Sequence, residues 1–174
     1  LQNPKRRLSR IFCSENNRPL LDEEISKILS ERTNPIPEPE ILSIQELNLL
    51  VPSDAVHQGF VTISAALQEP NFDWFLEKNK TTSHLILVLL DQVTDPQNVG
   101  AIARSSVALG AHGMILQSRN APKLDGVLAK AASGATEYIP IFRVTNIARA
   151  IRKMQDFDIS CFGLAGESDL SINN

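Results

Sequence analysis

The chain has 174 residues, of which 43% are hydrophobic and 21% charged, so it can build a folded core and is too apolar to be disordered throughout. Its net charge of −3 argues weakly against a nucleic-acid partner, although a local basic patch decides such binding. No apolar run is long enough to cross a membrane, and no Cys/His spacing resembles a zinc site. Cys13 and Cys161 lie in apolar surroundings, which predicts two reduced core thiols in a cytoplasmic protein.

The first half of the chain predicts short elements separated by prolines. The chain begins with a positively charged segment, the basic entry, which is followed by a short strand near residues 8–12. Apolar residues at helical spacing then predict a helix over 20–32. A strand at 41–44, a helix at 45–51 and a β segment at 57–67 follow. Residues 68–83 are polar and predict a linker with one or two helical turns. For its three aromatic side chains, Phe72, Trp74 and Phe75, we favour docking onto the core over stacking on RNA bases.

The second half alternates strands with helices. The run at 85–90 is continuously apolar, which is typical of a parallel strand buried on both faces. Further strands are predicted at 113–116, 139–142 and 159–164, and helices at 96–109, 125–132 and 146–157. This alternation predicts an α/β unit with a mostly parallel sheet.

The segment most indicative of function follows the first of these strands. Residues 91–105 read DQVTDPQNVGAIARS, and ligands of open α/β sheets bind beyond the carboxyl ends of strands. Asp95 suits a helix N-cap and Pro96 the first helical position. Asn98 then falls in the first turn, while Arg104, six residues later, lies on a different helix face at about 100° per residue. By itself the stretch fits a capped amphipathic helix with Arg104 in solvent, and it contains no dinucleotide or P-loop fingerprint.

Residues 91–105 also resemble the first signature motif of the SpoU (TrmH-like) branch of the SPOUT RNA 2′-O-ribose methyltransferases. Three later segments are similar to that family: residues 130–140 (KAASGATEYIP), 143–151 (RVTNIARAI) and 162–167 (FGLAGE). Upstream, residues 57–59 (HQG) resemble the junction after the family's RNA-binding domain. Within the family, the similarity is greatest to enzymes that methylate a guanosine ribose in large-subunit rRNA.

The resemblance implies a two-domain α/β plan. Residues 1–67 would form a small, ribosomal-protein-like RNA-binding domain, residues 68–83 a linker, and residues 84–174 the first part of a knotted, Rossmann-like SPOUT domain with a parallel sheet. The family's later Gly-x-Glu-x-x-Gly and Ser-Leu-Asn motifs are not found, so we expect a fragment at both ends that lacks most of the cofactor pocket and is inactive alone. Ala165, Gly166 and Glu167 would line the edge of that pocket.

The implied reaction is S-adenosylmethionine-dependent methylation of a ribose 2′-hydroxyl in rRNA or tRNA, by a protein that is a homodimer when complete and needs no metal. In the family, the residue matching Arg104 is the key catalytic group and the one matching Asn98 supports it. A guanidinium stays protonated in proteins, so stabilising the developing alkoxide or holding a phosphate suits Arg104 better than acting as the base. Both roles stay open, as does a phosphate of the substrate acting as base.

RNA contacts are expected partly from the basic entry, either as phosphate contacts or simply as a solvated arm: Lys5, Arg6, Arg7 and Arg10. For His57 and Gln58 we favour packing at the junction over base recognition, and for Glu137 a capped surface acid over a substrate contact.

Two other classes of function remain open. The chain could be a non-catalytic RNA-binding protein with a partial methyltransferase domain, or an unrelated doubly wound fold that binds a nucleotide-like ligand. The presence of both Asn98 and Arg104 favours a methyltransferase over the second of these.

Overall fold

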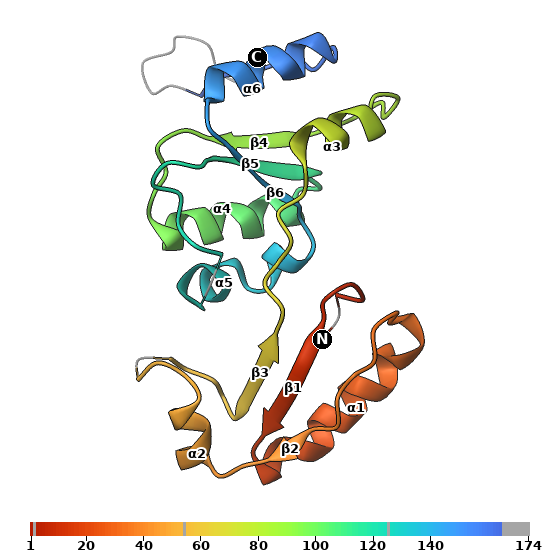
Figure 1. Cartoon of the computed structure of the whole chain (residues 1–174), viewed down its shortest axis with the longest axis vertical. Helices are drawn as coiled ribbons and strands as arrows, with labels where there is room; N and C mark the ends of the chain where they lie inside the picture. Colours follow the sequence, from red (N-terminus) through yellow and green to blue (C-terminus); the bar gives the residue numbers. More distant parts are fainter. Residues whose placement is uncertain (2, 54, 125, 165–174) are drawn as a thin grey trace.

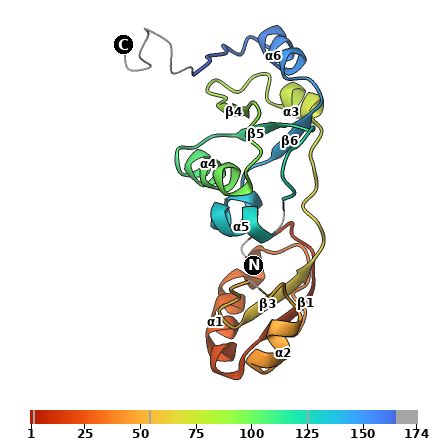
Figure 2. The same cartoon turned by 90° about the vertical axis from the view of Figure 1, so that its left-hand side faces the viewer.

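Two separate three-stranded sheets organise the chain (Figure 1). The structure is a computed structural model, which describes residues 1, 3–53, 55–124 and 126–164. We call residues 1–64 the N-terminal lobe and residues 85–164 the C-terminal lobe. Figure 2, turned by 90°, shows the two lobes following one another along the long axis, with the N-terminus at their junction.

The N-terminal lobe has a mixed sheet in the order β2-β1-β3. Its elements are β1 (Leu8–Cys13), η1 (Glu15–Asn17), α1 (Arg18–Ile28), η2 (Leu29–Glu31), β2 (Glu40–Ile41), α2 (Ile44–Leu49) and β3 (Phe60–Ser64). β1 runs parallel to β2 and antiparallel to β3. α1 packs on one face of the sheet through Leu21, which lies in a buried cluster with Ile11 and Cys13.

The prediction of a strand over 41–44 is only partly right. β2 ends at Ile41, and Ile44 already begins α2. The reason is a capping box, in which the Ser43 hydroxyl accepts from the Glu46 N–H and the Glu46 carboxylate accepts from the Ser43 N–H. These bonds satisfy two backbone donors and therefore favour an early start of the helix.

The C-terminal lobe has a fully parallel sheet in the order β4-β5-β6, which confirms the expected α/β architecture. Its elements are β4 (Leu87–Leu90), α4 (Pro96–Ala108), β5 (Gly113–Gln117), α5 (Gly126–Ala132), η3 (Ala135–Glu137), β6 (Ile141–Val144) and α6 (Ile147–Asp156), preceded by α3 (Phe72–Lys78). Figure 1 shows α4 and α5 on one face of the sheet and α3 and α6 on the other. Met114 and Leu116 pack toward the first layer and Ile115 toward the second, as alternation along a strand requires.

α3 docks the linker onto the sheet, as the aromatic residues predicted. The ring centroid of Phe142 lies 5.3 Å from that of Phe72 and 4.7 Å from that of Phe75. Trp74, in contrast, is 58% exposed, with the Lys78 ammonium over its ring. Two of the three aromatic side chains are thus core, and they cover the face of the sheet beside α6.

Two expectations about β4 and the end of the chain were wrong. Residues 87–89 are only half-buried. β4 contacts both helix layers, but it lies at an edge of the described sheet, which leaves one of its sides uncovered. The predicted strand over 159–164 does not form: these residues carry no strand pairing, and Phe162 and Leu164 are 86% and 84% exposed. Apolar composition alone cannot supply the neighbouring strand that a ladder needs.

The cysteines divide between the two lobes. Cys13 is buried, and burial raises the pKa of its thiol, as expected for a core residue. Cys161 is exposed, so its prediction as a core thiol was wrong for the same reason as the strand around it.

α4 and α5 approach each other closely at Gly100. A Cβ added to Gly100 would lie 2.6 Å from Ala131 Cβ, 2.7 Å from Leu128 O and 2.9 Å from Ala132 N. The last two are backbone atoms, which cannot move aside as a flexible side chain could. Gly100 is therefore required for the packing of α4, the helix that carries Asn98 and Arg104.

Gly100→Ala should accordingly lower the free energy of unfolding by about 1–3 kcal/mol, even though alanine is the better helix former. Gly126→Ala in α5 is the matched control, because nothing lies within 4 Å of a Cβ there; it should be neutral or stabilising by up to about 1 kcal/mol. Urea denaturation measures both. Equal stabilities for the two variants would contradict the close approach.

Candidate functional site

The carboxyl ends of β4, β5 and β6 lie at one edge of the sheet because the three strands are parallel. The loops that follow them start at residues 91, 118 and 145. Edges of this kind are where open α/β folds bind ligands. The segment with the signature motif therefore lies at the expected edge, together with the start of α6.

The motif loop leads into α4 as the sequence predicted. The Asp95 side chain accepts a hydrogen bond from the Gln97 N–H at 3.1 Å, and Pro96 occupies the first turn. The buried face of α4 consists of Val99, Gly100, Ala103 and Ser106. Asn98 and Arg104 lie outside this face, and both are exposed.

The structure does not bring Asn98 and Arg104 together. They are six residues apart on one helix, so they are separated by about 9 Å along its axis and point about 120° apart around it. In the described part of the chain, no hydrogen bond or ion pair holds either side chain. Both groups are therefore free to meet a ligand, but they would reach different parts of it.

The basic entry is less available than its sequence suggests. Arg10 makes a bidentate contact with Glu40, at 2.8 and 2.7 Å, and its guanidinium lies over the Phe12 ring. The Glu40 hydrogen bond raises the pKa of Arg10, and Arg10 in turn lowers that of Glu40. Lys5 and Arg7 are exposed and have no ion pair within the described ranges.

Arg6, the fourth basic residue, faces the C-terminal lobe. Its Nε lies 3.6 Å from Glu137 Oε1, and Asn3 Nδ2 donates to Glu137 Oε2 at 2.8 Å and to the Glu137 carbonyl at 3.1 Å. Arg32 holds this N-terminal segment in place by donating to the carbonyl oxygens of Leu1, Asn3 and Arg6. Glu137 is therefore a contact between the lobes, and the prediction of a capped surface acid was wrong.

His57 and Gln58 form a structured turn ahead of β3, and its hydrogen bonds to Asn17 and Asn48 lie within the N-terminal lobe, so the expected packing at the junction of the two domains was wrong. His57 Nδ1 accepts from the Gly59 N–H at 3.0 Å, so the proton is on Nε2, which lies 2.9 Å from Asn48 Oδ1. Gly59 has a φ of +82°, and a Cβ there would lie 2.2 Å from Asn17 Nδ2. The glycine is required by this turn, whereas the Gln58 side chain points to solvent.

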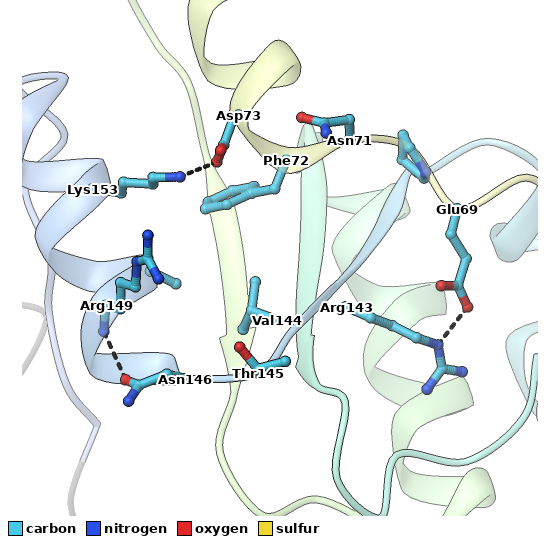
Figure 3. A pocket seen from close by; sticks show the side chains of 12 residues that line it. Glu69, Asn71, Phe72, Asp73, Arg143, Val144, Thr145, Asn146, Arg149 and Lys153 are labelled. Atoms are coloured by element: carbon cyan, nitrogen blue, oxygen red, sulfur yellow. Dashed lines mark hydrogen bonds and ion pairs between the residues drawn. The ribbon is translucent and has the colours of Figure 1, made fainter.

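A hollow of about 460 Å³ opens at the carboxyl end of β6, between α3 and α6 (Figure 3). Its polar lining includes Arg143, held by Glu69 at 2.6 Å, and Lys153, which pairs with Asp73. Arg149 lines it as well. Sequence reasoning missed this hollow: it noted residues 143–151 as a family-like segment, but the carboxylates that complete the lining come from the linker, 74 and 80 residues upstream of the cations that they pair with.

The predicted cofactor residues, Ala165, Gly166 and Glu167, lie outside the described residues. The hollow at β6 does not suit S-adenosylmethionine, whose reactive sulfonium is a cation. Three cations line the hollow, and its two carboxylates are already paired with two of them. We therefore place no part of the methyl donor there. Within residues 1–164 as described, no cluster of ligands could hold a metal ion, and no helix is long and apolar enough to span a membrane.

Solved structures share this fold. The SpoU methyltransferase AviRb from Streptomyces viridochromogenes, in complex with AdoMet, matches with a TM-score of 0.60 at 19% identity, over 87% of this chain and 54% of that one. The AdoMet-bound rRNA methyltransferase from Sinorhizobium meliloti matches with a TM-score of 0.62 at 22% identity, over 87% and 52%. The α/β arrangement described above is thus that of SpoU-type methyltransferases.

The sequence comparisons are more specific. The model of the SpoU rRNA Methylase family matches residues 85–173, just over half of the chain, and the chain belongs to this family. The 23S rRNA (guanosine-2′-O-)-methyltransferase RlmB of Shewanella oneidensis is 41% identical over 119 residues, and that of Yersinia pestis 39% over 120. Each match covers 67% of this chain, which spans about half the length of these relatives (47% and 48%).

The contact at Glu137 gives a testable expectation about the arrangement of the lobes. It is weak, since the ion pair is 3.6 Å long and Arg6 Nη1 is buried without a hydrogen-bond partner in the described part of the chain. Glu137→Ala should lower the free energy of unfolding by no more than about 1 kcal/mol. It should nevertheless increase the radius of gyration in small-angle X-ray scattering, because the lobes separate. Glu77→Ala, an exposed acid of α3, is the control, and identical scattering curves would count against the contact.

Proposed function

We propose that the complete protein is an S-adenosylmethionine-dependent methyltransferase of ribose 2′-hydroxyls in rRNA, with tRNA as the alternative substrate. The observation that carries the proposal is the family match over residues 85–173, together with about 40% identity to two RlmB enzymes. The position of the motif at the carboxyl edge of a parallel sheet supports it.

Arg104 is the residue we propose as catalytic. When bound, S-adenosylmethionine supplies an electrophilic methyl group to the ribose O2′. The reaction needs an acceptor for the O2′ proton, for which a phosphate of the substrate is suited, and stabilisation of the negative charge that develops on O2′. An exposed guanidinium without a carboxylate partner in the described structure keeps its full charge for this purpose. Because Asn98 lies about 9 Å away along the helix, we assign it to positioning the RNA or the donor.

RNA binding by the N-terminal lobe is a further part of the proposal. Lys5 and Arg7 are the two members of the basic entry best able to contact phosphates, since Arg6 and Arg10 are engaged by Glu137 and Glu40. We also propose a homodimer. The exposed apolar side chains of Phe162 and Leu164 support this, because such groups are commonly covered by another segment or chain. Sedimentation of the full-length gene product would measure it.

Arg104→Ala in the full-length gene product should lower kcat for transfer of labelled methyl groups to rRNA by about 10²–10³. Arg104→Lys should keep a larger share of the activity if the residue acts through its charge, and its pH–rate profile should not change. Arg152→Ala on α6 removes another exposed arginine and should leave activity unchanged. Full activity of Arg104→Ala would refute the assignment, and RNA binding without any transfer by the wild type would favour the non-catalytic alternative.

A further inference from the structure

The hollow at the carboxyl end of β6 has no part in the proposed reaction. It lies between the start of α6 and the segment that leads into α3, as Figure 3 shows. Phe72, which packs against Phe142, lies against it and ties it to the core. The hollow is therefore built by two segments that are held in place independently of any ligand.

Of the three cations that line the hollow, two are neutralised by carboxylates and one is not. Glu69 neutralises Arg143, whose Nη2 also donates to the Pro122 carbonyl at 2.6 Å, and Asp73 neutralises Lys153. Arg149 is exposed, and its guanidinium has no acidic partner in the described part of the chain. The lining thus carries one net positive charge, borne by a side chain that is free to bind.

We propose that this hollow binds a backbone phosphate of the RNA through Arg149, an inference that rests on the proposed function, because it assumes that the substrate is RNA. A guanidinium presents a planar set of donors that matches two phosphate oxygens. The volume of about 460 Å³ is within the range of small-ligand sites and leaves room for the sugar attached to that phosphate.

The position of the hollow suits an extended RNA strand. β6 is separated from β4 by β5 alone, so the two strand ends lie about 10 Å apart along the same edge. The loop after β5 carries Arg119 and Lys123, which are exposed and have no ion pair in the described structure. The loop at the start of α4 carries the exposed acids Asp91 and Asp95, so RNA that follows this edge would meet its cations at Arg119, Lys123 and Arg149.

Arg149→Ala and Arg152→Ala are a matched pair for testing the site. Both remove one exposed arginine of α6, but only Arg149 lines the hollow. Fluorescence anisotropy with a labelled single-stranded RNA and a labelled stem–loop would measure binding by the 174-residue chain at several salt concentrations. Arg149→Ala should weaken binding about tenfold and lower the salt slope by about one phosphate contact, whereas Arg152→Ala should change the affinity by no more than about twofold.

A second pair changes the charge in the opposite direction. Asp73→Asn frees Lys153 inside the hollow, and Asp156→Asn removes an exposed acid from α6 outside it. Asp73→Asn should strengthen RNA binding several-fold more than Asp156→Asn.

The outcomes separate the two proposals. If the wild type binds RNA and Arg149→Ala behaves like Arg152→Ala, the hollow is not a phosphate site, while the proposed function stands. If the wild type binds neither RNA, the phosphate site and the proposed RNA contacts of this chain both fail. A larger loss for Arg149→Ala together with a larger gain for Asp73→Asn supports the site.

Discussion

The close approach of α4 to α5 at Gly100 is the contact on which the candidate catalytic residues depend. Neither Asn98 nor Arg104 is held by a partner in the described structure, so only the placement of α4 positions them. That placement is fixed by the backbone contact at Gly100 on one side and by Val99 and Ala103 in the core of the sheet on the other. A site with free side chains thus rests on a rigidly packed helix, which orients groups more precisely than a loop does.

The contacts between the two lobes are weaker than the packing that positions α4. The linker docks firmly through Phe72 and Phe75, whereas the side-chain contacts across the junction converge on Glu137 and include one long ion pair. Small polar contacts of this kind permit changes in relative orientation. Arg6, engaged by Glu137, is also one of the cations expected to meet RNA. If RNA binds to the N-terminal lobe as proposed, a phosphate would compete with Glu137 for Arg6, and that competition would link RNA binding to lobe orientation.

The fold of the C-terminal lobe could be predicted largely from its sequence, because periodicity and capping are local. The Asp95-Pro96 start of α4 and the existence of α6, predicted as a helix over 146–157, both followed from the sequence. The strand at 159–164 could not be judged in this way, since strand formation needs a neighbouring chain that composition does not reveal. Gly100 was part of a recognised motif, but its packing role depends on α5, which lies more than 25 residues further along the chain.

The distribution of charged residues shows most clearly why the net charge of a chain is a poor guide to where RNA would bind. The chain is net acidic, and its densest basic stretch is at the N-terminus, yet three of the five cations there are paired with carboxylates: Arg6, Arg10 and Arg18. In the described structure only Lys5 and Arg7 of that stretch lack such partners, whereas the segments at the carboxyl edge of the parallel sheet carry three unpaired cations, Arg119, Lys123 and Arg149. An RNA phosphate responds to the local potential, not to the sum over the chain. We therefore expect phosphates to meet the ends of β5 and β6, where these three cations lie, more readily than the motif loop, whose charged side chains are Asp91 and Asp95.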